Sequence, residues 1–392
     1  MRHELIFPKR LLMGPGPSDV HPQVLKAMAT PLLGHLDPSF LNLMNETMDL
    51  IRYVYETKNQ VTIAMSGTGS AGMETVFVNL IEPGDKVIIG VNGLFGQRMV
   101  DVAQRAGAEV IQVEAEWGKI IEPASMEEAL KQHAPVKAVA VVHAETSTGV
   151  QQPLEEISKM AKEYNALFIV DAVTSLGGTK VAIDEVGIDA VYSGTQKCIS
   201  APPGLAPVSF SEKAVKVLSE RKTKVQSWYL DLSMIQAYWG KERFYHHTAP
   251  ISMVYSLYSA LSLIQEEGLE AVFKRHELNG RALQIGLEAM GLELFAQEGH
   301  RLPMLTSVRI PEGIEDAKVR KTLLERYGIE IGGGLGPVKG QIWRIGLMGY
   351  SSQRSNVLQF LSALESILRE EGFKLEDGQA VKAAEKYYSH NE

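Results

Sequence analysis

The 392-residue chain contains a single cysteine, Cys198. One cysteine cannot form an intramolecular disulfide or a cysteine-based zinc cluster, and such scarcity is typical of a reducing compartment. Long apolar runs are missing as well, because no stretch approaches about 18 uncharged apolar residues, the length of a membrane-spanning helix. The first eight residues lack the apolar stretch of a signal peptide. These absences predict a cytoplasmic protein without a membrane partner.

Positive charge is in deficit too. The 39 lysines and arginines are outnumbered by 47 aspartates and glutamates, which gives a net charge of -8. An acidic chain does not attract a polyanion, so we expect no nucleic acid partner. The hydrophobic share of 45% is that of an ordinary globular protein. At roughly 100–200 residues per domain, the length predicts two domains or one large domain with an appendage.

Short apolar runs alternate with segments of helical periodicity in the first half of the chain. The runs cover residues 61–65, 86–90, 136–142, 166–170 and 190–192. Apolar runs without polar alternation, joined by helical crossovers, are typical of a mostly parallel sheet that is covered by helices. The pattern therefore predicts an α/β fold.

After about residue 250 the pattern changes to longer helical segments, followed by two strand-like segments at 304–310 and 341–345. This change indicates a smaller α+β domain at the end of the chain. We expect an N-terminal arm over residues 1–17, a large domain over 18–266 and a small C-terminal domain over 267–392.

Polar residues follow the apolar runs, and in an open parallel sheet ligands bind beyond the carboxyl ends of the strands. The residues that follow these runs are Ser66-Gly67-Thr68-Gly69-Ser70, Glu145-Thr146-Ser147-Thr148, Asp171 and Ser193-Gly194-Thr195-Gln196-Lys197. Together they hold hydroxyls, a carboxylate and a lysine. Such a set suits a phosphorylated, cationic cofactor that bears a carbonyl group.

The glycine-rich segment 67–72 has two functional interpretations. It matches the G-x-G-x-x-G pattern of dinucleotide sites, which makes a nicotinamide-dependent oxidoreductase the alternative from another enzyme class. Such a site also needs an acidic residue about 20 positions later, where this chain has Asn92. Backbone N–H groups and the hydroxyls of Thr68 and Ser70 at a helix N-terminus would bind a phosphate in either case. A plain strand–helix turn explains this motif alone equally well.

Asp171 and Lys197 are separated by 26 residues, a spacing that fits one crossover to the next strand. Taken singly, the aspartate could cap a turn and the lysine could lie on the surface. As a pair at strand ends they match the needs of a pyridoxal phosphate enzyme. Such an enzyme uses a lysine to form a Schiff base and a carboxylate to keep the pyridine nitrogen protonated. The pair therefore predicts pyridoxal 5'-phosphate as the cofactor.

From the Met13-Gly14-Pro15-Gly16-Pro17-Ser18 arm to Arg344, the chain resembles the class V, fold-type I aminotransferases. It is most similar to the alanine–glyoxylate and serine–pyruvate aminotransferases. Further motifs that carry the resemblance are Asn92-Gly93-Leu94-Phe95-Gly96-Gln97-Arg98, Val170-Asp171-Ala172-Val173, Tyr245-His246-His247-Thr248 and Trp343-Arg344-Ile345-Gly346. The resemblance implies a homodimer with shared active sites.

The resemblance also implies roles for individual residues. Lys197 would form the Schiff base and Asp171 would face the pyridine nitrogen. The phosphate would be held by Thr68, Gly69, Ser70 and Gln196. Tyr245 and Thr248 would reach the phosphate of the neighbouring subunit.

Three further residues would surround the cofactor ring. Val173 would pack under it, and Phe95 stands where the stacking residue is commonly tryptophan. Thr146 stands where serine is usual and would contact the side of the phenolic oxygen. The extra methyl group of Thr146 lies beside the expected substrate position and leaves the substrate preference open.

Arg344 would clamp the substrate α-carboxylate, close to the backbone of Gly14. A guanidinium suits this task because it forms two parallel hydrogen bonds with a carboxylate. His35 lies in a loop that lines the substrate entrance in this family, at a position where a ureidoglycine-using relative commonly has glutamine. We expect amino transfer from L-alanine or L-serine to glyoxylate, or a similar small 2-oxo acid, by a ping-pong mechanism through a pyridoxamine form. (S)-Ureidoglycine is the alternative donor.

A metal site is not expected. The adjacent pair His246-His247 suggests metal ligands, but neighbours on a helix or strand cannot both face one ion. No third ligand is evident nearby in the sequence.

Overall fold

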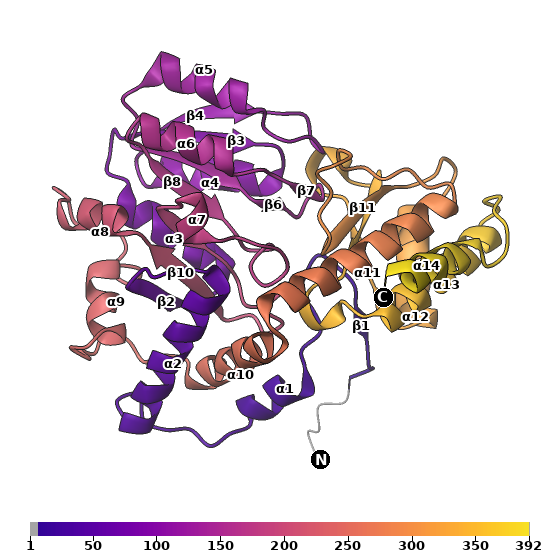
Figure 1. Ribbon diagram of the computed structural model, residues 1–392, viewed down its shortest axis with the longest axis horizontal. Helices are drawn as coiled ribbons and strands as arrows, with labels where there is room; N and C mark the ends of the chain where they lie inside the picture. Colours follow the sequence, from indigo (N-terminus) through magenta and orange to yellow (C-terminus); the bar gives the residue numbers. More distant parts are fainter. Residues whose placement is uncertain (1–6, 392) are drawn as a thin grey trace.

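The computed structural model describes residues 7–391, and its centre is a seven-stranded sheet (Figure 1). The strands in spatial order are β2 (Val61–Ser66), β10 (Leu205–Phe210), β9 (Ala190–Tyr192), β8 (Leu167–Asp171), β5 (Ala138–Val142), β3 (Lys86–Val91) and β4 (Glu109–Glu114). Neighbouring strands are parallel except where β10 pairs with β2 and β9. The predicted α/β fold with a mostly parallel sheet is confirmed.

Two of these strands lie outside the predicted apolar runs. Strand β4 is at the edge of the sheet, and its residues are mostly exposed or half-buried, so its sequence alternates instead of forming a continuous apolar run. Strand β10 contains Pro207, a residue that is disfavoured inside sheets because it has no N–H to donate. The proline removes one donor, but its carbonyl oxygen still accepts the Ser193 N–H at 2.8 Å and the Tyr55 hydroxyl at 3.0 Å.

Helices that connect the strands pack against the sheet. They are α2 (Pro38–Tyr55), α3 (Gly69–Leu80), α4 (Leu94–Arg105), α5 (Pro123–His133), α6 (Glu155–Glu163), α7 (Ile183–Val186) and α8 (Glu212–Ser219). Local sequence sets where α2 begins, because the Asp37 carboxylate accepts the Ser39 N–H at 2.8 Å and Pro38 occupies the first turn. Shorter or peripheral elements complete this part: α1 (Pro22–Met28), β6 (Ala144–Glu145), β7 (Val150–Gln151), α9 (Leu232–Trp239) and α10 (Ile251–Glu267).

The C-terminal part has its own small sheet, with β14 (Ile342–Gly346) between β11 (Leu305–Arg309) and β13 (Gly332–Gly333). Figure 1 shows its helices gathered on one side of the molecule. These helices are α11 (Leu269–Ala289), α12 (Asp316–Arg326), α13 (Arg354–Glu370) and α14 (Gln379–Asn391). Buried side chains form one large cluster that ends at Val272 and a second that includes Ala282 through Tyr388, so helix α11 contributes to both. The domain boundaries given above stay our proposal.

The N-terminal arm joins the C-terminal part although it is far away in sequence. Strand β1 (Leu11–Leu12) pairs in parallel with β12 (Ile329–Glu330), and Met13 is fully buried in the second cluster. The first six residues of the predicted arm lie outside the described residues. Among residues 7–391, no helix is both long enough and apolar enough to cross a membrane.

Candidate active site

A cavity of about 200 Å³ lies beyond the carboxyl ends of the central strands. Its lining unites the residues predicted to hold the ring and phosphate within one chain: Thr68, Gly69, Ser70, Phe95, Thr146, Asp171, Val173, Gln196 and Lys197. Met73, Arg98 and Ala144 also line it and were not predicted from the sequence. Arg98 could have been found, since it lies in the 92–98 motif and three residues after Phe95 on one helix. Its guanidinium lies 4.9 Å from the centre of the Phe95 ring.

One end of the cavity is built to bind an anion. Thr68 is the N-cap of α3, and its side chain makes no capping bond, so the first N–H groups of the helix stay available. A Cβ on Gly69 would lie only 3.2 Å from Val173, so the backbone approaches the cavity closely there. The Gln196 Oε1 atom is buried without a hydrogen-bond partner among the described residues. Unpaired backbone donors fit a bound phosphate, whereas Oε1 can only accept a hydrogen bond, so the Gln196 carboxamide would hold the phosphate through its Nε2 donors.

Asp171 ends strand β8 and is 2% exposed. Its Oδ1 accepts the Val173 N–H at 2.8 Å, which fixes the orientation of the carboxylate. Burial raises the pKa of Asp171 from 3.8 to about 7, although the bond from Val173 opposes the rise. A carboxylate that is this costly to bury alone is stabilised by a cationic partner, such as a protonated ring nitrogen.

Lys197 lies in the turn after β9, and its Nζ donates a hydrogen bond to the Pro15 carbonyl oxygen of the arm. A Cβ on Gly16, whose φ is +109°, would lie 2.5 Å from the same Nζ. The arm thus covers the amine, and glycine is required at residue 16. Burial and, to a smaller extent, the charge of Arg344 lower the pKa of Lys197 to about 8. A lysine that loses its proton this readily is a competent nucleophile at neutral pH.

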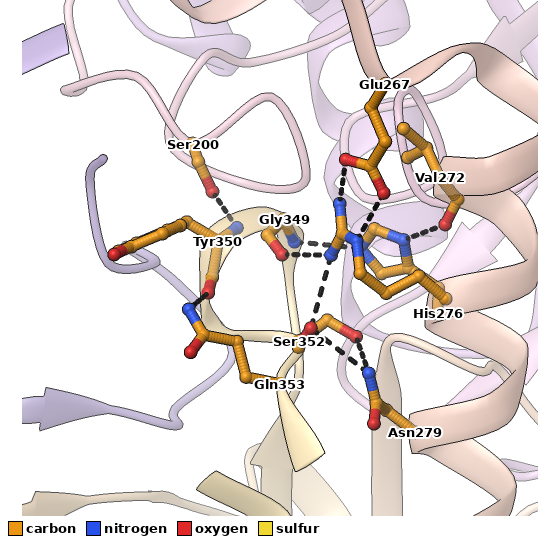
Figure 2. A network of polar contacts seen from close by, with 10 residues as sticks. Ser200, Glu267, Val272, His276, Asn279, Gly349, Tyr350, Ser352 and Gln353 are labelled. Atoms are coloured by element: carbon orange, nitrogen blue, oxygen red, sulfur yellow. Dashed lines mark hydrogen bonds and ion pairs between the residues drawn. The ribbon is translucent and has the colours of Figure 1, made fainter. Parts of the chain in front are cut away.

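The turn after Lys197 is hydrogen-bonded to the loop at residues 349–353, which includes the short helix η2 (Gly349–Ser351). Ser18 Oγ donates to the Lys197 carbonyl oxygen at 2.7 Å, and Ser200 Oγ accepts the Tyr350 N–H at 2.8 Å. Helix α11 holds this loop in turn, because His276 Nε2 accepts the Gly349 N–H at 2.9 Å (Figure 2). The lysine therefore sits on a backbone that is fixed on two sides.

Arg275 and Asn279 add to this support from helix α11 (Figure 2). Arg275 donates to the Gly349 carbonyl oxygen at 2.8 Å and is itself paired with Glu267 through two bonds of 2.6 and 2.9 Å. Asn279 donates to the Ser352 carbonyl oxygen at 3.1 Å. Burial lowers the pKa of His276, which lies among these groups, to about 3, so its ring is neutral.

Glu145 organises the opposite wall although no role was predicted for it. Its buried carboxylate accepts the Phe95 N–H at 3.1 Å and the Ser147 hydroxyl at 2.5 Å. Burial raises its pKa, and these hydrogen bonds oppose the rise. The carboxylate thereby ties the start of helix α4, with Phe95, to the loop that carries Thr146.

Arg344 lies on strand β14 of the small sheet and is 5% exposed. Its Nε donates to the Gly333 carbonyl oxygen at 2.8 Å, and its Nη1 donates to the Thr146 carbonyl oxygen at 3.2 Å. The second bond places the guanidinium against the cavity wall. Gly14 lies nearby, since the Gly346 N–H, two residues further along β14, donates to the carbonyl oxygen of the preceding residue, Met13, at 2.7 Å. Burial lowers the pKa of Arg344 to about 10, which still leaves it charged at neutral pH.

Besides Arg344 and Gly14, three predicted residues do not line this cavity in the single chain. Tyr245 and Thr248 are exposed, and their side-chain oxygens lie 3.3 Å apart. His35 lies beside them, with its ring centre 5.1 Å from that of Tyr245. Exposed Tyr245 and Thr248 and half-buried His35 therefore form a separate group. Their predicted contribution to a neighbouring subunit stays a prediction.

The adjacent histidines, 246 and 247, lie in an irregular segment, so the argument from helix or strand geometry does not apply to them. Their Nδ1 atoms face each other at 2.7 Å. Within residues 7–391, no group of three or more histidine, cysteine, aspartate or glutamate side chains could hold a metal ion.

Comparisons with known proteins agree with this geometry. The model of the aminotransferase class-V family matches residues 11–356. The (S)-ureidoglycine–glyoxylate transaminase of Bacillus subtilis is 42% identical over 99% of this chain and 98% of its own length. The alanine–glyoxylate aminotransferase of Drosophila melanogaster is 40% identical over 94% of this chain and 95% of its own.

Solved structures show the same two kinds of relative. The ureidoglycine–glyoxylate aminotransferase of Bacillus subtilis superimposes with a TM-score of 0.97, at 43% identity over 99% of this chain and 100% of that one. An alanine–glyoxylate aminotransferase from Nostoc sp. gives a TM-score of 0.92, at 47% identity over 94% of this chain and 98% of that one.

Proposed function

This chain belongs to the class V aminotransferases, which are pyridoxal phosphate-dependent transaminases of fold type I, and we propose that it transfers the amino group of L-alanine or L-serine to glyoxylate. One observation carries the proposal: Lys197 and Asp171 line one cavity, and Arg344 is bonded to the wall of that cavity. A lysine for the aldehyde, a carboxylate for the ring nitrogen and a guanidinium for the substrate carboxylate are what amino-acid transamination requires.

Bound pyridoxal phosphate supplies an electron sink for the electron pair left behind when a proton leaves the α-carbon. The chain supplies the proton movements around it. Lys197 is positioned to take the α-proton and to return it elsewhere, because burial lowers its pKa to about 8 and a neutral amine can act as a base. Asp171 would hold the proton of the ring nitrogen, and the bond from Val173 keeps its carboxylate in place.

Substrate orientation would come from the second part of the chain. Arg344 projects from β14 toward Thr146 and would bind the carboxylate that amino donors and 2-oxo acids share. The arm at Pro15 and Gly16 covers Lys197 and would exclude water from the reacting atoms. Because donor and acceptor would use the same guanidinium, they would bind in turn, which is the ping-pong order expected from the resemblance.

Glyoxylate is proposed as the acceptor because the Bacillus, Drosophila and Nostoc relatives all carry it in their names. For the donor, His35 supports alanine or serine, since the family's ureidoglycine-using relative commonly has glutamine there. (S)-Ureidoglycine is the second candidate, favoured by the 42% identity with the Bacillus enzyme over 99% of this chain. We do not retain the nicotinamide-dependent alternative, because Asn92 after β3 is not an acid and donates to the Lys119 carbonyl oxygen at 2.9 Å.

A homodimer with shared sites is part of the proposal. Tyr245 and Thr248 are exposed and do not line the cavity of their own chain, which supports a role in a neighbouring one. The cytoplasmic location stays a prediction from the sequence.

The test is a matrix of activities on the purified holoenzyme, with L-alanine, L-serine and (S)-ureidoglycine as donors and glyoxylate and pyruvate as acceptors. We expect the highest kcat/KM with alanine or serine and glyoxylate. A clear preference for ureidoglycine would select the second candidate.

Lys197→Ala should lower turnover by about 10²–10⁴-fold, whereas Lys180→Ala, which changes an exposed lysine paired with Glu185, should not. Rapid multiple turnovers by Lys197→Ala would refute the mechanism.

A further inference from the structure

Two adjacent histidines link the exposed segment that carries Tyr245 to the strand that leads into the phosphate loop. His247 Nε2 lies 2.8 Å from the hydroxyl of Ser66, the last residue of β2. The Nδ1 atoms of His247 and His246 are 2.7 Å apart, and His246 Nε2 lies 3.1 Å from the Trp228 carbonyl oxygen. The four residues thus form one continuous chain of hydrogen bonds.

The chemistry at one end fixes the direction of every bond in this chain. The Trp228 carbonyl can only accept, so His246 Nε2 carries a proton, and the Nδ1 of a neutral His246 is an acceptor. His247 Nδ1 must therefore donate, which leaves its Nε2 to accept the proton of the Ser66 hydroxyl. With both rings neutral, this is the one arrangement of protons that satisfies all three bonds. Burial lowers the pKa of His247, and the nearby His246 lowers it further, in agreement with a neutral ring.

Aromatic packing keeps the two rings in place. The ring of His246 stacks on Trp228 at 4.2 Å between centres, and the ring of His247 lies 4.8 Å from that of Tyr229. A second anchor of the segment, Arg243, donates to the Trp239 carbonyl oxygen at 3.0 Å and to Asn45 Oδ1, so it faces helices α9 and α2 and not strand β2. The link to β2 therefore runs through the histidine.

The Ser66 end of the chain adjoins the anion-binding end of the cavity. Gly67, the next residue, adopts a φ of +134° and donates its N–H to the Gly204 carbonyl oxygen at 2.9 Å. Thr68 follows as the N-cap of α3 and lines the cavity. If the Ser66 side chain moved, the backbone of Gly67 and Thr68 would move with it, and so would the N–H groups that are proposed to bind the phosphate.

We propose that His247 is a positioning residue for the cofactor phosphate, acting through the Ser66 hydroxyl on the loop at residues 67–70 of its own chain. His247 also lies between Tyr245 and Thr248, so the same side chain would orient the segment that reaches the neighbouring cavity. That second effect rests on the proposed dimer. The first effect depends on one chain alone.

The experiment measures the affinity of the enzyme for pyridoxal phosphate and for pyridoxal, which has the same ring and aldehyde but no phosphate. Cofactor absorbance during equilibrium dialysis of the holoenzyme reports both dissociation constants without reference to turnover. We expect Ser66→Ala and His247→Phe each to raise the dissociation constant for pyridoxal phosphate about tenfold, the usual effect of losing one hydrogen bond. The dissociation constant for pyridoxal should change less than about twofold, since these residues act on the phosphate.

Three matched variants sharpen the result. His247→Gln keeps an acceptor for the Ser66 hydroxyl and should restore most of the affinity for pyridoxal phosphate. The double variant Ser66→Ala/His247→Phe should be no weaker than either single variant, because both remove the same bond. His390→Gln, which changes an exposed histidine on α14, should leave both dissociation constants unchanged.

Two results would overturn the proposal: an equal loss of affinity for pyridoxal phosphate and pyridoxal, or additive effects in the double variant. The first would show general damage to the site, and the second would show that the two residues act independently. Ser66→Ala removes a single oxygen atom, so it tests the proposal even if His247→Phe fails to fold. Neither readout involves donor or acceptor, so failure here is distinct from failure of the proposed substrates.

Discussion

The Arg344 Nη1 atom donates a hydrogen bond to the Thr146 carbonyl oxygen at 3.2 Å, although the two residues are 198 positions apart. Arg344 belongs to the small antiparallel sheet, and Thr146 lies in the loop after β6, beside the central sheet. This bond brings the one buried guanidinium of β14 to the wall of the cavity that holds Lys197 and Asp171. In the proposed function, recognition of a carboxylate and chemistry at the α-carbon would therefore draw on two separately packed parts of the chain.

Replacing Arg344 should separate binding from catalysis. We expect Arg344→Ala to raise KM for alanine and glyoxylate about a hundredfold, as for loss of a buried charge pair, with a much smaller change in kcat. Arg344→Lys keeps the charge without the planar fork and should give an intermediate KM. Arg309→Ala on neighbouring β11 removes an exposed arginine and serves as the control. Steady-state kinetics provide the measurement, and an unchanged KM in Arg344→Ala would remove this residue from the substrate site.

Asp171 should make the apoenzyme less stable as the pH rises. Its pKa is about 7 in the folded chain against 3.8 for the free group, so folding favours the protonated form. The stability that this protonation contributes is therefore lost as the pH increases from about 4 to about 7. Asp171→Asn does not titrate, so its apoenzyme should melt several degrees higher than wild type at pH 8.

The difference in Tm between Asp171→Asn and wild type should shrink as the pH approaches 4. Thermal melts of the two apoenzymes over pH 4–8 measure this difference. The control is Asp49→Asn, which changes an exposed aspartate paired with Arg52. A difference that stays constant with pH would contradict the raised pKa. The same variant should lose most of its transaminase activity, because asparagine cannot stabilise a positive charge on the ring nitrogen.

The loop behind Lys197 should tolerate no side chain at residue 349. Gly349 has a φ of +53°, and a Cβ there would collide with Ser200 Oγ and lie 2.5 Å from the Cys198 carbonyl oxygen. Gly349→Ala is expected to destabilise the protein by about 2–4 kcal/mol, the sum of a left-handed backbone and a steric clash. Gly340→Ala also has a positive φ, +73°, but meets no atom within 4 Å, so it should cost about 1 kcal/mol. Urea denaturation of both variants checks the difference, and equal costs would show that residue 349 is not tightly packed.

Much of the candidate site could be predicted because its residues end strands. Asp171 and Lys197 follow apolar runs that form neighbouring parallel strands, with Asp171 in register with Tyr192 of β9, so their carboxyl ends meet at one edge of the sheet. The cover over Lys197 could not be predicted this way. Pro15 and Gly16 reach the lysine because strand β1 pairs with β12, and no local periodicity encodes a contact between residues so far apart in the chain.

The fold shows the same limit. Strand β10 runs antiparallel and contains Pro207, so neither its direction nor its existence follows from the apolar pattern that revealed β5 and β8. Its place between β2 and β9 depends on long-range pairing and on the Tyr55 hydroxyl, which binds the Pro207 carbonyl oxygen. Edge strand β4 departs from the apolar pattern for a different reason. It has a neighbouring strand on one side only, and most of its residues are exposed or half-buried.

Mixed dimers can decide whether Tyr245 and Thr248 serve their own chain or its partner. Lys197→Ala lacks the amine, and Tyr245→Ala/Thr248→Ala lacks the exposed hydroxyls, so each homodimer should be impaired at both cavities. If the hydroxyls serve the partner, a mixed dimer has one complete cavity: the intact Lys197 of the second chain joined by the intact Tyr245 and Thr248 of the first.

Co-expression with two affinity tags isolates this mixed dimer. Its kcat/KM at low pyridoxal phosphate should then recover to about half that of wild type, as one intact site of two requires. If the hydroxyls serve their own chain, no cavity of the mixed dimer is complete, and its activity should not exceed half that of the Tyr245→Ala/Thr248→Ala homodimer. That outcome, or a fully active monomer in light scattering, would refute the shared site.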